Sequence, residues 1–289
     1  MIKNILTKAA AFLLFIGILV ACYLILDENK DRLAQDGVPV YTYCLKTKED
    51  ADCTLINQQG INILIDTGEK QDSERIVRFL KAKNIKTLQY LILTHPDKDH
   101  IGGALQVLEN FKVERVIQPY YPKENELLDE INKRCEDLGV QVIYPTRTRK
   151  LEVGEIDLLV YPPLEKHYKL DNNYSLAVLI NHGNVNELFT GDAQEKRINE
   201  LLEINWRNID LLKIPYHGRY SANVDKLIEK CTARYAVVTS DSADDIIWEA
   251  CTQSGTLVLT TLECTRSFVS DGKELKLLKA RNGDYYNEN

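Results

Sequence analysis

The stretch LTHPDKDHIGG, residues 93–103, carries two of the five histidines of this chain, with two aspartates between them. His95, Asp97, Asp99 and His100 are potential metal ligands that lie within six residues of one another. Clustered carboxylates repel one another and resist desolvation unless a cation offsets their charge. Imidazole and carboxylate ligands together suit zinc, iron or manganese. The stretch therefore predicts a metal site directly after a buried strand.

The spacing within the stretch suggests two ions. His95 and Asp97 are two residues apart, so a turn directs both toward one ion, whereas the adjacent Asp99 and His100 face a second. Two ions about 3.5–4 Å apart can share a hydroxide that attacks a phosphoryl or acyl centre. The triplet DTG, residues 66–68, is also found in aspartic proteases, but a single copy would leave the 95–100 cluster unexplained.

Composition indicates a folded globular body. The chain has 289 residues, 44% hydrophobic and 27% charged, and a formal net charge of -7. An acidic chain is a poor candidate for nucleic-acid binding unless a local basic patch exists. The clearest basic run is TRTRK, residues 146–150, which reads either as a solvated hairpin or as a contact for a phosphate backbone.

An uncharged apolar run occupies residues 9–26, AAAFLLFIGILVACYLIL. Eighteen helical residues reach about 27 Å, close to the roughly 30 Å of a bilayer core. We therefore expect a membrane anchor over residues 1–26, with its helix at 9–26, and a polar linker over 27–38.

The charges flanking this run predict its orientation. Lys3 and Lys8 precede it and Asp27 and Glu28 follow it, which favours a single-pass protein with its body outside the cytoplasm. Two alternatives are a cleaved signal peptide and a lipoprotein, because LVAC, residues 19–22, resembles a lipobox.

Hydrophobic periodicity predicts alternating strands and helices. Strands are expected within residues 38–45, 53–56, 61–68, 88–95, 113–119, 140–145, 155–163, 175–183, 186–193, 208–218, 234–240 and 256–263, with a final hairpin over 267–278. Helices are expected within 73–85, 102–111, 124–139, 194–204, 223–233 and 244–255. Two sheets packed face to face with helices outside would bury these apolar residues in one body.

Three local features carry further expectations. Ser73 is a plausible N-cap for the helix that follows it. Cys44 and Cys53 flank a polar loop and form the best candidate disulfide, whereas Cys135, Cys231 and Cys251 share helical faces with apolar residues and are expected in the core. His167 and His182 lie in a polar loop and a turn and are expected at the surface.

The histidine–aspartate cluster resembles the H-x-H-x-D-H signature of the metallo-β-lactamase superfamily, with Asp97 in place of the second histidine. That replacement and the following IGG look most like the extracytoplasmic metallo-hydrolase domains of the ComEC family of competence proteins. Further matches follow in order: ILIDTG at 63–68, NNYSL at 172–176, FTGD at 189–192 and LLKIPYHG at 211–218. The resemblance covers residues 39–289 and implies a four-layer αββα sandwich, an α/β fold, preceded here by one transmembrane helix.

The resemblance also implies a ligand set. His95, Asp97 and Asp192 would hold one divalent ion, zinc or manganese, and Asp99, His100, Asp192 and His217 the other. Asp66 would orient a ligand histidine, and Asn173 and Ser175 would contact substrate. Asp99, Asp192 and Tyr216 would serve catalysis.

Three departures from the family pattern concern the substrate and turnover. The glycine-rich V-G-Q-G-D stretch is absent, and KTKEDAD, residues 46–52, stands near its place. Tyr216 replaces the first histidine of H-H-G, and no histidine follows His217, so the late G-H-P is missing. A phenol with a pKa near 10 is a weaker acid than imidazole at neutral pH.

Together these features predict a membrane-anchored metallo-hydrolase that cleaves a phosphodiester. The expected substrate is a nucleic acid or a cell-envelope polymer, and the sequence does not identify any protein partners. The alternative is a metal-binding module with little activity in an envelope assembly, which the missing late histidine favours.

Overall fold

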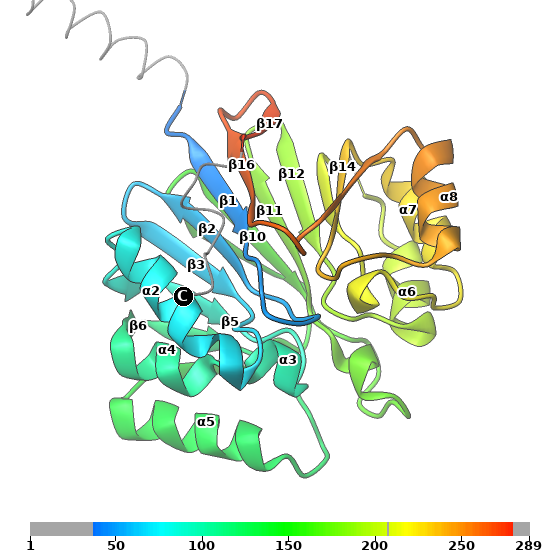
Figure 1. The fold of residues 1–289 in the computed structure, drawn as a ribbon. Helices are drawn as coiled ribbons and strands as arrows, with labels where there is room; N and C mark the ends of the chain where they lie inside the picture. Colours follow the sequence, from blue (N-terminus) through cyan, green and yellow to red (C-terminus); the bar gives the residue numbers. More distant parts are fainter. Residues whose placement is uncertain (1–36, 207, 280–289) are drawn as a thin grey trace, which may run out of the picture. The chain divides into compact units, whose positions relative to one another are not determined.

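The computed structural model describes residues 37–206 and 208–279, and contacts divide the chain into two compact units, Met1–Val38 and Pro39–Asn289. Figure 1 shows the layers of the second unit, in which two sheets face each other and helices cover their outer sides. This arrangement confirms the expected α/β sandwich.

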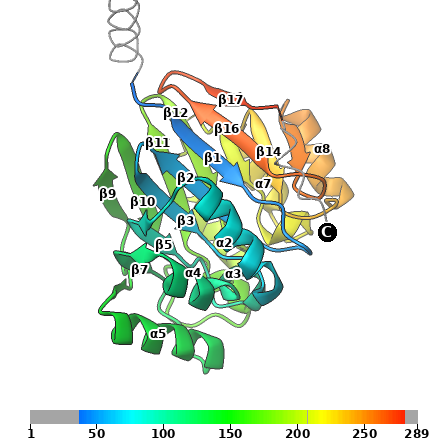
Figure 2. The ribbon, with the colours of Figure 1, turned by 60° about the vertical axis from the view of Figure 1, so that its left-hand side comes forward.

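The first sheet holds eight strands among the described residues, in the order β17-β16-β1-β2-β3-β5-β7-β8. Figure 2 shows the β16–β17 hairpin beside β1, with which β16 pairs antiparallel. The bounds are β1 (Val40–Cys44), β2 (Thr54–Gln58), β3 (Ile61–Ile65), β5 (Tyr90–Ile92), β7 (Arg115–Ile117), β8 (Gln141–Ile143), β16 (Arg266–Ser270) and β17 (Leu275–Leu277).

The second sheet has the order β15-β14-β13-β12-β11-β10-β9. Its strands are β9 (Arg149–Val153), β10 (Ile156–Tyr161), β11 (Ala177–His182), β12 (Val185–Phe189), β13 (Leu211–Lys213), β14 (Tyr235–Val238) and β15 (Leu257–Thr260). A small separate pair joins β4 (Thr87–Leu88) to β6 (Lys112–Val113).

Helices flank both sheets (Figure 1). On the first sheet they are α2 (Ser73–Ala82), α4 (Ala104–Asn110) and α5 (Glu126–Leu138), and on the second α6 (Glu195–Leu202), α7 (Val224–Cys231) and α8 (Asp245–Gln253). Short helical turns are α3 (Lys98–Ile101) and the 3₁₀ helices η1 (Lys70–Asp72), η2 (Asp171–Tyr174) and η3 (Tyr216–Gly218).

Three apolar cores hold the layers together. Alternate residues of both sheets, such as Ile63 and Val178, fill the space between the sheets. The apolar faces of α2, α4 and α5 pack on the first sheet, and those of α6, α7 and α8 pack on the second. Cys135, Cys231 and Cys251 lie in the two outer cores, as expected.

Parallel pairing positions the functional edge. In the first sheet β3, β5, β7 and β8 run parallel, and in the second β12, β13, β14 and β15 do. The residues that follow the carboxyl ends of parallel strands lie at one edge of a sheet, where ligands bind in open α/β sheets.

The predicted disulfide is wrong. Cys44 and Cys53 are both free and buried. The amide of Leu45 donates to the carbonyl of Cys53 at 2.9 Å, and Cys44 lies opposite Thr54. Because successive strand residues point to opposite faces, Cys44 enters the core between the sheets and Cys53 the core beneath the helices.

The helix ends follow the sequence only in part. Gly139 ends α5 with φ 66°, as its position predicted. Ser73 is not the N-cap of α2: it is the first helical residue, and Asp72 precedes the helix. The Asp72 carboxylate instead accepts the amides of Lys48 and Glu69.

The predicted anchor over residues 9–26 and most of the linker lie outside the described residues. Within residues 37–206 and 208–279, no helix is both long and apolar enough to cross a bilayer.

A carboxyl group lies inside the apolar core between the sheets. Glu187, on β12, is 1% exposed and points to the same side as Val185 and Phe189. Burial raises the pKa of Glu187 to about 7, with a smaller contribution from Asp210 that the Thr42 hydroxyl opposes. The folded protein therefore binds a proton there that the unfolded chain releases above its own pKa of 4.5.

We expect Glu187→Gln to change the pH dependence of stability. Because its folded pKa is raised, the contribution of Glu187 to wild-type stability is complete below pH 4.5 and is lost as the pH rises through about 7. The loss is about 3 kcal/mol by linkage. Urea unfolding of metal-free protein at pH 5 and pH 8 should show this fall in wild type and a smaller one in Glu187→Gln. If wild type and Glu187→Gln lost the same free energy of unfolding between pH 5 and pH 8, Glu187 would not be the group that titrates.

Candidate metal centre

The 95–100 cluster lies at the carboxyl end of β5. His95 and Asp97 stand on the turn after the strand, and Asp97 directly precedes α3, which contains Asp99 and His100. The following glycines allow close packing, since a Cβ on Gly102 would lie 2.5 Å from the amide nitrogen of Lys70. A Cβ on Gly103 would lie 2.4 Å from the Thr67 carbonyl oxygen, so IGG fixes this turn against η1 and the end of β3.

The Nε2 atoms of three histidines face carboxylates. His217 Nε2 lies 3.0 Å from both Asp99 Oδ2 and Asp192 Oδ2. His100 Nε2 lies 3.4 Å from Asp192 Oδ1, and His95 Nε2 lies 3.6 Å from Asp97 Oδ2. The structure thus brings together all six predicted ligands from the ends of β5, β12 and β13.

The Nδ1 atoms of the same histidines face other groups. His100 Nδ1 lies 2.8 Å from Asp66 Oδ2, and His217 Nδ1 lies 3.0 Å from the Thr239 hydroxyl. Asp66, which follows β3 with a φ of 58°, also accepts the amide and the hydroxyl of Thr94. Asp66 therefore lies beside the His100 ring, where its predicted role of orienting that histidine is geometrically possible, and the role stays a prediction.

Asp52 is a further member of this cluster that the sequence did not reveal. One ligand atom from each of Asp52, His100, Asp192 and His217 lies within 4.8 Å of the others. Asp52, however, faces the Nδ1 atoms, at 3.4 Å from His217 and 3.8 Å from His100. It therefore backs the histidines from the side opposite Asp99 and Asp192. The one available signal was that KTKEDAD, which stands near the place of the family's V-G-Q-G-D stretch, also ends in an aspartate, Asp52.

The donor set fits divalent metal ions. Among the described residues, the Nε2 atoms of His95 and His100 are buried without a hydrogen-bond partner. Such atoms are costly to bury unless something binds them. Three imidazole nitrogens beside carboxylate oxygens form a ligand set for zinc, iron or manganese.

The electrostatics of the cluster favour cations. Burial alone would raise the pKa of Asp192, but Lys213, His217 and His100 lower it well below its usual value. Burial would raise the pKa of Asp99 too, yet the hydrogen bond from His217 and the charge of His100 lower it to about 2. Asp192 and Asp99 likewise raise the pKa of His217 to about 9 against burial. Metal binding would therefore displace protons from the imidazoles.

Tyr216 precedes the ligand histidine in a strained turn. Tyr216, His217 and Gly218 have φ values of 52°, 50° and 81° in succession. This left-handed run turns His217 toward the carboxylates. Tyr216 is half-buried, and the Arg219 guanidinium lies 5.7 Å from its ring centroid. Its predicted catalytic role stays a prediction.

Asn173 and Ser175 support the turn that carries Asp192. The Asp192 amide donates to Ser175 Oγ at 3.1 Å, and Asn173 Oδ1 accepts the amide of Arg197. Both residues are buried, so the structure uses them within the fold. Their predicted substrate contacts stay a prediction.

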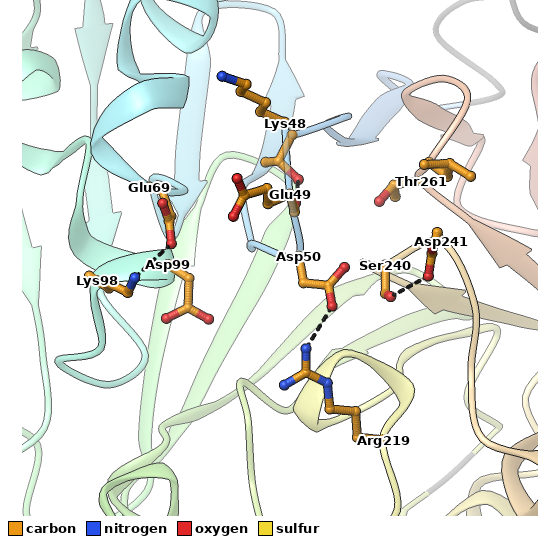
Figure 3. A pocket seen from close by; sticks show the side chains of 12 residues that line it. Lys48, Glu49, Asp50, Glu69, Lys98, Asp99, Arg219, Ser240, Asp241 and Thr261 are labelled. Carbon is orange, nitrogen blue, oxygen red and sulfur yellow. Dashed lines mark hydrogen bonds and ion pairs between the residues drawn. The ribbon is translucent and has the colours of Figure 1, made fainter.

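A polar pocket of about 560 Å³ opens over Asp99. Figure 3 shows the ion pairs in its wall, Lys98 with Glu69 at 3.4 Å and Arg219 with Asp50 at 2.8 Å. The lining residues are Thr47, Lys48, Glu49, Asp50, Glu69, Lys98, Asp99, Arg219, Ser240, Asp241, Thr261 and Leu262.

The other two histidines differ from each other. His167 is exposed, as expected. The surface prediction for His182 is wrong, because its ring is buried at the end of β11 and its Nδ1 lies 2.8 Å from Ser270 Oγ. The basic run at 146–150 is exposed and leads from the first sheet into the second, where Arg149 and Lys150 begin the β9–β10 hairpin, in agreement with the expected solvated hairpin.

The fold and the set of histidines and aspartates are those of an αββα sandwich of the metallo-hydrolase type. The chain belongs to the metallo-beta-lactamase superfamily, whose family model matches residues 47–238. It is similar to ComE operon protein 3 of Bacillus subtilis, at 28% identity over 68% of this chain and 29% of that protein. It is also similar to Recombination protein 2 of Haemophilus influenzae, at 27% identity over 65% of this chain and 22% of that protein. The chain thus spans less than a third of either relative.

Solved structures show the same fold at low identity. The metallo-beta-lactamase fold protein YhfI from Bacillus subtilis has a TM-score of 0.57 and 13% identity, over 81% of this chain and 99% of that one. CmlA, a diiron beta-hydroxylase from Streptomyces venezuelae, has a TM-score of 0.50 and 16% identity, over 80% of this chain and 54% of that one. These likenesses concern the fold alone.

We expect the purified protein to bind close to two transition-metal ions per chain, because the Nε2 atoms and carboxylates form two adjoining groups. Elemental analysis after gentle purification, or after rebinding to chelated protein, measures this number. His100→Ala should lower the metal content, whereas His167→Ala, at an exposed position, should not. A wild-type protein that neither retains nor rebinds metal would exclude this centre.

Proposed function

We propose that this protein is a metal-dependent hydrolase that cleaves phosphodiesters. The observation that carries the proposal is the convergence of His100 and His217 Nε2 with Asp192 and Asp99, with His95 Nε2 beside Asp97 and a polar pocket over Asp99. Membership of the superfamily supports hydrolysis in general, and the choice of a phosphodiester is the finer part of the proposal.

The proposed centre uses the chain's own residues in distinct roles. His95, Asp97, Asp99, His100, Asp192 and His217 would hold two divalent ions, with Asp192 shared between them. When bound, such ions stabilise developing negative charge and activate water for attack. Asp99 contacts His217 and also lines the pocket. It would therefore bind metal at the side of the centre that faces the substrate. Asp66 and Asp52 would keep the histidine rings in place.

Manganese is a candidate metal as well as zinc. Asp97 supplies oxygen where the superfamily signature has a histidine, and a carboxylate oxygen is a harder ligand than imidazole. We therefore propose that manganese supports turnover at least as well as zinc.

The pocket wall carries three cationic side chains that could contact an anionic substrate, Lys48, Lys98 and Arg219. Five carboxylates line the same pocket, so these cations would receive phosphate oxygens only if the pairs of Lys98 with Glu69 and Arg219 with Asp50 open. Nucleic acid is the first candidate, since one relative is named a recombination protein. The net charge of -7 weighs against it, so a cell-envelope phosphodiester is the second.

A metal-binding module with little activity is the alternative. No histidine follows His217, and in the described structure Thr239 contacts its Nδ1 while Ser240 and Asp241 line the pocket. If the late histidine of the family protonates the leaving group, Tyr216, next to His217, is the proposed replacement, and the Arg219 guanidinium lies 5.7 Å from its ring centroid.

Asp192→Ala separates the two functions. We expect it to abolish hydrolysis of bis-p-nitrophenyl phosphate and single-stranded DNA, because both proposed ions lose a ligand. Asp66→Ala should reduce the rate by roughly 10–100-fold, since Asp66 contacts a ligand and not the metal. Steady-state rates with manganese and with zinc measure both effects.

Two further outcomes of this experiment are decisive. Tyr216→Phe should slow only substrates with poor leaving groups if the phenol donates a proton. Equal inertness of wild type and Asp192→Ala on every phosphodiester, with metal still bound by wild type, would favour the module.

We also propose that residues 9–26 anchor the protein in a membrane with the body outside the cytoplasm. The charge-free run and its flanking lysines and acids support this, as does the likeness to ComEC-type proteins. Protease added to intact spheroplasts should then digest the body. Digestion only after lysis would reverse the topology.

A further inference from the structure

A buried lysine lies inside the candidate centre. Lys213, the last residue of β13, is 2% exposed. Its Nζ lies 2.5 Å from Asp52 Oδ2, 3.0 Å from Asp192 Oδ1 and 3.0 Å from the Gly191 carbonyl oxygen. An ammonium group has three hydrogens to donate, so these three acceptors satisfy it completely.

The ammonium shares a carboxylate with the metal donor set. Asp192 Oδ2 faces His217 Nε2 at 3.0 Å, while Asp192 Oδ1 accepts from Lys213. The second partner, Asp52, stands on the Nδ1 side of the same histidine at 3.4 Å. Lys213 therefore contacts Asp192, which is expected to bind metal, and Asp52, which lies behind the His217 ring.

Lys213 also contributes to the charge balance of the carboxylates and the proposed ions. Its carboxylates are Asp52, Asp66, Asp97, Asp99 and Asp192. Two divalent ions would leave one negative charge over, and the Lys213 ammonium neutralises it. A buried carboxylate without a compensating charge is strongly unfavourable.

We propose that Lys213 is a resident cation of the centre and a positioning residue for Asp192. It holds Asp192 and Asp52 in place before metal arrives, and it stabilises the same carboxylates that metal stabilises. Lys213 and metal therefore substitute partly for one another. A lysine with a purely structural role would stabilise the metal-free and metal-loaded proteins equally.

Thermal unfolding of full-length Lys213→Met, with and without manganese, tests this inference. The chelated variant should melt roughly 10 °C below chelated wild type, because two carboxylates lose their cation. With manganese bound, the difference in Tm between the variant and wild type should be less than half of the difference between the chelated proteins. The rise in Tm on metal addition is thus larger in the variant than in wild type.

A matched control is Arg197→Met. Arg197 is also a buried cation, but its guanidinium pairs with Glu200 at 2.7 Å and with backbone carbonyls, away from the histidines. It should lower Tm equally with and without metal. If Lys213→Met fails to fold without metal, Lys213→Met combined with Asp52→Asn removes one unpaired charge and should still show the larger metal-induced rise.

Equal losses of Tm in the chelated and loaded Lys213→Met proteins would overturn the proposal. So would a wild type whose Tm does not respond to metal. The inference rests on the metal centre of the proposed function, but the melts need no substrate. A protein that hydrolyses nothing yet shows the metal-dependent difference would retain the resident cation and lose the hydrolase assignment.

Discussion

The crowding of buried carboxylates at one edge of the sandwich constrains the whole centre. Asp52, Asp66, Asp99 and Asp192 each lie within 3.4 Å of a ring nitrogen of His100 or His217. Two like charges 4 Å apart repel by about 4 kcal/mol at an effective dielectric constant of about 20. The cluster is therefore stable only with cations among its members. Imidazolium groups and Lys213 can supply them in the metal-free protein, and divalent ions can replace the protons.

The fold meets this requirement by ending parallel strands of two sheets at a common edge. β3 and β5 deliver Asp66 and the 95–100 cluster, while β12 and β13 deliver Asp192, Lys213 and His217. Positive φ angles at Asp66 and at His217 turn these side chains inward. Such strain persists only where surrounding packing enforces it, here the three apolar cores that fix the strands.

The sequence predicted what local pattern and motif order determine. Hydrophobic periodicity located most strands and helices but missed β9, Arg149–Val153, because its residues are mostly exposed and charged. The motifs named the six side chains that the structure brings together. It could not predict which groups meet across long separations. Lys213 reads as the end of an apolar strand, and its pairing with Asp52 requires the packing of two sheets. His182 reads as a turn residue until Ser270, from the other sheet, covers it. The Cys44–Cys53 pairing failed because spacing does not show which face of a strand each thiol occupies.

The fold itself leaves the reaction open, since a diiron beta-hydroxylase shares it with this superfamily's hydrolases. Three features of the centre bear on the reaction: oxygen at Asp97, the Lys213 ammonium beside Asp192 and no histidine after His217. The first two keep metal positions available and balanced in charge. If the late histidine of the family protonates the leaving group, its absence would favour substrates whose leaving groups need no protonation.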